Sequence, residues 1–234
     1  MEDNNLTFDK KKHLLYSKDA KRIILKHLHM NFPEDEESLW NEIQLKYIEF
    51  LETAPYIGGK KNMQAQPVYD CYSLFAYYEV VPVKPTMAEL EDMNSELFLT
   101  QTEKRRFINL NNPIFIRLAN TVFTLLSKNI RKHENEYEDN YIMEVLPFDK
   151  NEGIRYKFHR CPIAEFAKVH GHTDIMAPFC NPDYPLIEVM HGKLIRTTTC
   201  ANGAFCDYTI VGDKSPKIQN HPEYKDENGF VRNR

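Results

Sequence analysis

The chain has 234 residues, of which 42% are hydrophobic and 27% charged, a composition typical of a globular protein. Its 30 Lys and Arg against 34 Asp and Glu residues give a formal charge of −4, which argues against a nucleic-acid partner because such proteins are usually strongly basic. No apolar run approaches the ~20 residues of a membrane span, and the polar, acidic start does not fit a signal peptide. We therefore expect a cytoplasmic protein without a membrane partner.

The first part of the chain, residues 1–138, is predicted to be helical. Apolar residues recur at helical spacing over 12–30 and 39–51, and the aromatic-rich stretch 68–80 is expected to form a buried helix. Thr86 and Glu89 have the spacing of a capping box, which predicts a further helix after residue 86.

A last helix of this part is predicted to begin at Asn112 and Pro113. Asn is a good cap and Pro is favoured at the first helical position, so the helix should run to about Arg131, followed by a charged linker over 132–140.

From residue 139 the hydrophobic period changes to that of strands. Alternation over 153–160 predicts a half-buried strand paired with 141–147. Helices are expected at Pro162 and at Thr173, and then a hairpin of two strands around Asn202-Gly203. The hairpin strands are 193–199 and 204–211. The order strand, strand, helix, helix, strand, strand predicts an α+β region over 139–212, with an antiparallel sheet and helices on one face. Residues 213–234 are expected to be a loosely attached polar tail.

The composition also limits the chemistry. With only 8 glycines and no Gly-rich phosphate motif, the sequence predicts no nucleotide site and no cofactor. There are 5 cysteines, at positions 71, 161, 180, 200 and 206. An odd number without a secretory signal indicates reduced thiols, and four of them cluster between residues 161 and 206.

Cys161 directly precedes Pro162 at a predicted helix start. Free backbone N–H groups and the positive end of the helix dipole favour a thiolate there, and His159 and Arg160 are expected to lower the pKa further. The residue is either a nucleophile or metal ligand, or a small buried side chain.

Two acidic residues accompany the later cysteines. Cys180 and Asp183 belong to one unit, CNPD, in which Pro182 opens a helical turn; Asp183 is either a general base or an acid at a helix start. In the last strand, alternation turns Cys206 toward the core and Asp207 toward the other face, where an acid needs a partner. Cys200 is interpreted as incidental.

His170-Gly171-His172 allows a metal site or a helix C-cap, and the C-cap is the commoner arrangement at a helix end. No Cys-x-x-Cys occurs, so a zinc ribbon or a thioredoxin-type centre is not expected. Three separate thiols converging on a metal remain an alternative.

Several spaced motifs within 158–208 together form a recognisable signature. They are FHRC at 158–161, Gly171, PFCNPD at 178–183, and a final hairpin with Thr199, Gly203 and CDY at 206–208. This set resembles the L-2-amino-thiazoline-4-carboxylic acid hydrolase family. The resemblance covers residues 40–211 and more weakly includes the segment from Pro55 to Asn62. Tyr208 departs from it, since Phe is expected there.

The resemblance implies a hydrolase that opens a small cyclic isothiourea to N-carbamoyl-L-cysteine, toward cysteine biosynthesis. For such a reaction we take Cys161 as the candidate nucleophile and Asp183 or Asp207 as the group that moves protons or binds the amidinium, while Cys180 and Cys206 complete the catalytic pocket. The residues predicted for substrate binding are His159, Arg160, Arg196, Asn62 and Thr199. The expected partner is a small molecule, with a homo-oligomer possible.

Two other functions use the same thiols. One is a non-enzymatic module that binds a metal or a small molecule, and the other is a redox protein with a reversible disulfide. The hydrolase ranks first, the metal or ligand binder second and the redox protein third.

Overall fold

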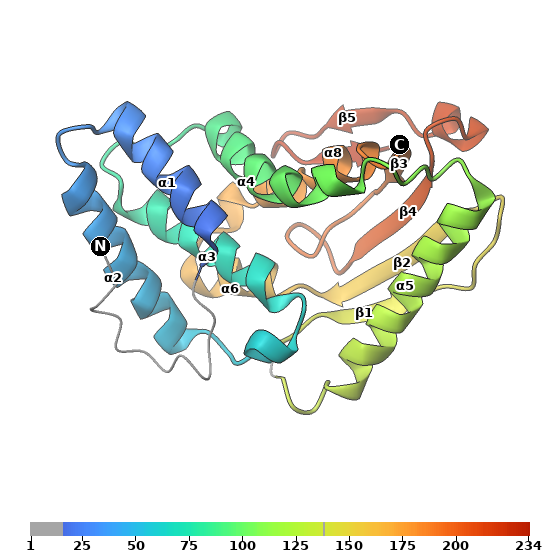
Figure 1. Cartoon of the computed structure of the whole chain (residues 1–234), viewed down its shortest axis with the longest axis horizontal. Helices are drawn as coiled ribbons and strands as arrows, with labels where there is room; N and C mark the ends of the chain where they lie inside the picture. Colours follow the sequence, from blue (N-terminus) through green and yellow to red (C-terminus); the bar gives the residue numbers. More distant parts are fainter. Residues whose placement is uncertain (1–15, 138) are drawn as a thin grey trace.

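The computed structural model describes residues 16–137 and 139–234 and shows a mixed α+β fold (Figure 1). The helical elements are α1 (Lys18–Asn31), α2 (Glu36–Thr53), α3 (Ala65–Val80), α4 (Met87–Thr102), α5 (Pro113–Lys132), α6 (Pro162–His170), α7 (Ala177–Cys180) and α8 (Asp183–Glu188). The strands are β1 (Ile142–Val145), β2 (Ile154–Arg160), β3 (Gly192–Ile195), β4 (Cys206–Gly212), β5 (Glu223–Lys225) and β6 (Val231–Asn233). The predicted fold class is confirmed.

Local signals in the sequence account for where the helices begin. Thr86 and Glu89 form both hydrogen bonds of the capping box at α4. Asn112 caps α5 by accepting a hydrogen bond from the Ile114 N–H at 2.9 Å, with Pro113 in the first position. The prediction over 12–30 is observed from Lys18 onward, and residues 12–15 lie outside the described part of the chain.

The first hydrophobic core is built around α3, whose residues 68–77 are all buried. An amphipathic surface helix would expose one face; α3 is apolar or aromatic on nearly every side, so it lies inside the molecule. Helices α1, α2, α4 and α6 pack around it. Because α6 comes from the second part of the sequence, the helical region and the α+β region share this core.

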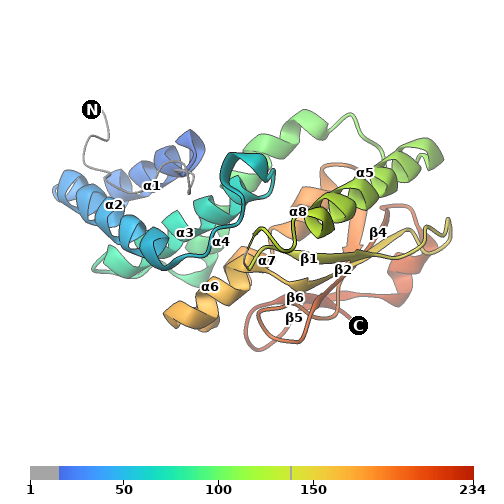
Figure 2. The ribbon, with the colours of Figure 1, turned by 90° about the horizontal axis from the view of Figure 1, so that it is seen from below.

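The second core lies between the sheet and two helices. The sheet has the order β1-β2-β4-β3 with antiparallel neighbours, and α5 and α8 cover one face of it (Figure 2). The strand alternation predicted over 153–160 holds: Ile154 and Tyr156 turn toward this core, while Arg155 and Lys157 turn to the other face.

Two predicted details are wrong. The strand expected over 193–199 ends at Ile195, because the following segment leaves the sheet to bind the Asp207 side chain. The segment after residue 212 is not a loose tail. It forms the hairpin β5–β6, in which Phe230 and Asn233 are buried. Burial of these two side chains and their hydrogen bonds to the preceding segments hold the hairpin in place.

Candidate functional site

The structure brings together four of the five residues predicted as catalytic. Cys161 lies at the start of α6, Cys180 at the end of α7, Asp183 at the start of α8, and Cys206 at the start of β4. Cys206 belongs to the first hydrophobic core, and Cys161 and Cys180 both pack against that core. Burial is the largest cause of the raised pKa of the Cys180 thiol, and the charges of Cys161 and Asp183 add to it.

Asp183 is fixed by two donors on one carboxylate oxygen. The Arg196 Nη1 group donates to Oδ2 at 2.7 Å, and the Tyr208 hydroxyl donates to the same oxygen at 2.7 Å. Within the described residues the other oxygen, Oδ1, accepts no hydrogen bond. The side chain is 34% exposed. Oδ2 is therefore held by Arg196 and Tyr208, while Oδ1 is available to a ligand.

Arg196 is buried, with only 1% of its surface exposed, and it contacts two parts of the site. Its Nη2 group donates to the Cys180 carbonyl at 3.1 Å, and its guanidinium lies 5.1 Å from the ring centre of Tyr184 and 5.7 Å from that of Tyr208. These contacts orient Asp183 and the end of α7 together. With Nη1 and Nη2 committed to protein partners, Arg196 acts here as a positioning residue.

Cys161 occupies the N-cap of α6, as the sequence predicts, but its acidity differs from the prediction. Burial raises the pKa of its thiol to about 12, against the lowering by the N–H groups of Ala164 and Ile163. The lowering of this pKa that was expected from His159 is not observed, because His159 pairs with Glu144 at 2.9 Å. Desolvation therefore outweighs the helix dipole, and the free thiol is protonated at neutral pH.

The thiol of Cys180 also has a raised pKa. Burial raises the pKa of its thiol to about 12, although the Arg196 charge and the Thr199 hydroxyl lower it. As whole residues, Cys161 and Cys180 are half-buried. Thr199 is fully buried, and its hydroxyl donates to Asn202 Oδ1 at 2.9 Å.

Cys200, interpreted from the sequence as incidental, belongs to the cluster. Its N–H donates to Cys206 Sγ at 3.1 Å, and its thiol donates to the Phe158 carbonyl at 3.2 Å. The hydrogen bond with the Cys200 thiol, together with burial, raises the pKa of Cys206. The sequence held a signal for this pair, because only five residues separate the two cysteines and Asn202 and Gly203, which favour a turn, lie between them.

Asp207 lies beside this cluster and organises the loop after β3. Its Oδ1 accepts from the N–H groups of Thr197 and Thr198 at 2.9 and 2.8 Å, and its Oδ2 accepts from the Thr197 hydroxyl at 2.7 Å. The partner that the sequence required for an acid in mid-strand is thus this loop. A Cβ at Gly203 would collide with the Thr198 hydroxyl, so the same loop requires glycine there.

The structure gives the remaining predicted binding residues partners away from Asp183. The Arg160 Nε group donates to the Asn140 carbonyl at 2.8 Å. His159 is exposed on the opposite face of the sheet. Asn62 is buried and donates to the Ile57 carbonyl at 2.7 Å and to Asn140 at 3.1 Å, which ties the 55–62 segment to the start of the sheet.

Two further residues take roles near the site that the sequence did not predict. Tyr208, noted in the sequence only as a departure from the family pattern, shares its strand face with Cys206 and donates a hydrogen bond to Asp183. Asn233 accepts from the Arg196 N–H at 2.9 Å and from the Tyr184 hydroxyl at 3.0 Å. No local pattern points to Asn233, because its partners lie 37 and 49 positions earlier in the chain.

The described residues provide no ligand set for a metal centre. Across residues 16–137 and 139–234, no group of three or more His, Cys, Asp or Glu side chains is arranged to hold a metal ion. His172 instead bonds Glu79 at 2.8 Å and stacks on Phe75, while Gly171 adopts a left-handed C-cap conformation.

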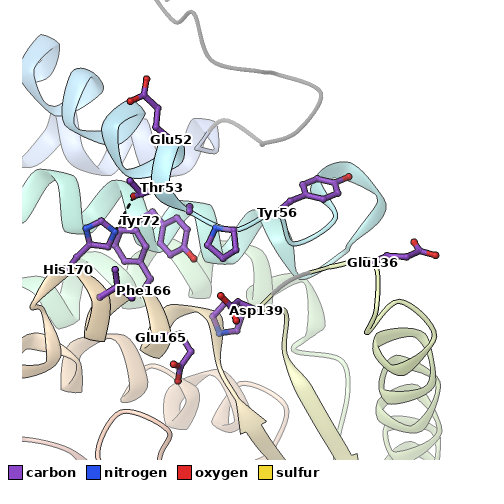
Figure 3. Close-up of a pocket in the computed structure, with 13 residues that line it drawn as sticks. Glu52, Thr53, Tyr56, Tyr72, Glu136, Asp139, Glu165, Phe166 and His170 are labelled. Carbon is purple, nitrogen blue, oxygen red and sulfur yellow. Dashed lines mark hydrogen bonds between the residues drawn. The ribbon is translucent and has the colours of Figure 1, made fainter.

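A cavity of about 630 Å³ lies on the outer face of α6, between that helix and the end of α2 (Figure 3). Pro162, the residue after Cys161, lines it, and so does Tyr72. None of Cys161, Cys180, Asp183 and Cys206 is among the described residues that line this cavity.

Comparison with known proteins gives one family match. The family model described as L-2-amino-thiazoline-4-carboxylic acid hydrolase matches residues 96–210, a range that includes all four cysteines of the cluster as well as Asp183 and Arg196. No curated protein and no solved structure gives a significant match. In the described part of the chain, no helix has both the length and the apolar character that crossing a membrane requires.

Proposed function

Through residues 96–210 the chain belongs to the L-2-amino-thiazoline-4-carboxylic acid hydrolase family, and we propose that it hydrolyses L-2-amino-thiazoline-4-carboxylate, or a related small cyclic amidine. The product would be N-carbamoyl-L-cysteine, and Cys161 and Asp183 would carry the reaction. The alternative metal-binding module has less support, since the described thiols and acids form no ligand group.

The observation that carries this proposal is the convergence of Cys161, Cys180, Cys206 and Asp183 on one place. These residues come from four different elements, and Arg196 and Tyr208 fix Asp183 among them. A nucleophile, an oriented acid and a buried positioning cation are the parts that hydrolysis at an amidine carbon requires.

We assign Cys161 the role of nucleophile because it alone combines partial exposure with the start of a full helix. Its raised pKa keeps the free thiol neutral. A bound amidinium would place a positive charge beside the thiol and lower its pKa, so the thiolate would form only when substrate is present. The N–H groups at the start of α6 would then favour negative charge on the reacting atoms.

The proposed reaction has two displacements. The Cys161 thiolate bonds to the ring carbon that lies between nitrogen and sulfur, the ring carbon–sulfur bond breaks, and the released substrate thiolate takes up the proton that Cys161 lost. Water then adds to the same carbon and expels Cys161, which leaves the carbamoyl group. Asp183 Oδ1 would bind the amidinium N–H groups and would accept a proton from the attacking water. Asp183 would then pass this proton to the Cys161 sulfur as it departs.

The other residues take supporting roles in the proposal. Cys180, Cys206 and Thr199 would shape the pocket wall, and Asp207 would hold its loop. Arg160 is a basic side chain, 28% exposed, that would face a substrate carboxylate. His159 and Asn62 receive no part in the reaction, because each is committed to another partner.

Ring opening releases a free thiol, so a thiol-reactive dye measures the reaction directly. We expect Cys161→Ser to abolish turnover of L-2-amino-thiazoline-4-carboxylate while leaving the thermal unfolding curve close to that of the parent protein. Cys71→Ser is the matched control: Cys71 is buried in α3 and its thiol donates to Asn94 Oδ1 at 3.9 Å, which can accept from the hydroxyl. Normal turnover by Cys161→Ser would refute the nucleophile assignment.

A further inference from the structure

Helix α5 is apolar on two faces, and only one of them is covered. Its inner face packs on the sheet. Four apolar side chains of the outer face are between 56% and 74% exposed, namely Ile114, Leu118, Val122 and Leu125. Their spacing of three and four residues places them in one stripe along the helix. Figures 1 and 2 show no described helix or strand over this outer stripe. A surface helix normally turns polar residues outward, so the stripe indicates a contact outside the chain.

The charged residues of α5 are all of one sign. The helix carries Arg117, Lys128, Arg131 and Lys132 and contains no Asp or Glu, although the whole chain has a formal charge of −4. Arg117, Thr121 and Lys128 follow one another at intervals of four and seven residues, which places them in a row beside the outer stripe. Within the described part of the chain, none of the four basic side chains forms an ion pair. Their charge is therefore available to an anionic partner.

The segment that leads into α5 continues the same chemistry. Lys104 and Arg105 are exposed there, and Phe107 is 74% exposed. Long cationic side chains beside exposed aliphatic and aromatic groups are typical of surfaces that rest on a lipid bilayer. The apolar groups enter the interface, while the cations extend to the phosphates of the headgroups.

We propose that the outer stripe of α5 docks on a lipid bilayer that carries anionic headgroups, with Arg117 and Lys128 bound to the headgroup phosphates. The contact is peripheral, because no described helix has the length and apolar character that crossing a membrane requires. Such a bilayer is a membrane partner of a kind that the sequence does not predict, since the sequence only shows that no apolar run is long enough for a span.

A second copy of the chain fits the outer stripe less well than a bilayer does. In an antiparallel pair of α5 helices, Arg117 and Lys128 of opposite helices would meet at both ends of the contact. In a parallel pair, each of these cations would meet its own equivalent. Because α5 contains no carboxylate, neither arrangement compensates the repulsion. Four apolar side chains are also few, since a stable interface takes about 20–30 residues on each side.

Co-sedimentation of the full chain with vesicles tests the proposal. Vesicles of equal parts phosphatidylglycerol and phosphatidylcholine provide an anionic surface, and vesicles of phosphatidylcholine alone provide a matched surface without net charge. We expect the partition coefficient to be at least about tenfold higher on the anionic vesicles. Binding should weaken as salt is raised from about 0.1 M to about 1 M, because salt screens the attraction to the headgroups.

Single substitutions locate the contact on the molecule. Leu118→Gln, Leu125→Gln and Lys128→Gln should each lower the partition coefficient about fivefold. Leu45→Gln and Lys18→Gln are the matched controls, because Leu45 on α2 is 63% exposed and Lys18 is exposed at the start of α1. Figure 1 shows both helices at the opposite end of the molecule from α5, so neither control should change binding. All five side chains are exposed, so each variant should unfold at the parental temperature.

Equal partition on the two kinds of vesicle would overturn the proposal, as would losses in the control variants as large as those in the α5 variants. Failure to bind either kind of vesicle would also overturn it and would leave the outer stripe to a protein partner. Analytical ultracentrifugation without lipid examines the remaining occupant. A dimer that Leu118→Gln dissociates would assign the stripe to a second copy and contradict the bilayer.

Discussion

Arg196 and Asp183 form an ion pair whose two partners are very unequally buried. The Arg196 Nη1 group lies 2.7 Å from Asp183 Oδ2, and the exposed fractions of the two side chains are 1% and 34%. The same guanidinium also bonds the Cys180 carbonyl. This cation therefore depends on its partner for compensation, while the carboxylate retains contact with water.

We predict that the two ends of this pair respond differently to substitution. Asp183→Asn leaves a buried cation without its counter-charge, which costs about 3–5 kcal/mol of unfolding free energy. Arg196→Met removes the buried charge and leaves a carboxylate that water reaches, so its cost is smaller, about 1–3 kcal/mol. Urea denaturation of both variants measures the difference. Equal losses, or the reverse order, would show that the pair is not buried as described.

The reactivity of Cys161 and Cys180 toward iodoacetamide follows from their pKa values. Burial raises both to about 12, and only the thiolate reacts. The rate at each site should rise about tenfold per pH unit from pH 8 to 10 without levelling off, while N-acetylcysteine levels off above its ordinary pKa. Peptide mass spectrometry resolves the sites, and circular dichroism monitors folding. A plateau below pH 10 would contradict the burial of these thiols.

Asn233 is predicted to position the site from the end of the chain. Its Oδ1 accepts from the Arg196 N–H and the Tyr184 hydroxyl, and Asn233→Ala leaves both donors unpaired in a buried place. We expect a loss of about 1–3 kcal/mol of unfolding free energy and a lower kcat. Glu227→Ala, in the exposed turn of the same hairpin, should change neither. A variant Asn233→Ala with parental kcat would remove the hairpin from the site.

Asp70 should make the stability of the fold depend on pH. It is fully buried in α3, where burial raises its pKa to about 6 although the Ser17 N–H donates to it at 2.5 Å. The folded pKa exceeds the unfolded one, so the stabilising contribution is complete below about pH 4 and is lost as the pH rises through 6.

Comparison with Asp70→Asn isolates this effect. Between pH 4.5 and 7.5, the unfolding free energy of the variant should gain about 2 kcal/mol on that of the parent, measured by urea denaturation at both values. A constant difference across this range would show that Asp70 ionises normally.

The sequence by itself determined most of the secondary structure and the resemblance to the family. Caps at Thr86 and Asn112, and the alternation over 153–160, are interactions between neighbouring residues, so the local pattern was sufficient. The clustering of the cysteines and the CNPD unit likewise pointed to the part of the chain that carries the site, and the family match covers it.

The tertiary structure decided the burial, the acidity and the hydrogen-bond partners of those residues. Only the fold shows that burial outweighs the helix dipole at Cys161, that Arg196 is committed to Asp183, and that the last residues pack against Arg196. The physical reason is the same each time. Desolvation and the choice of hydrogen-bond partner depend on segments that are distant in the chain and close in space. The spacing of residues within one segment does not reveal which other segments pack against it.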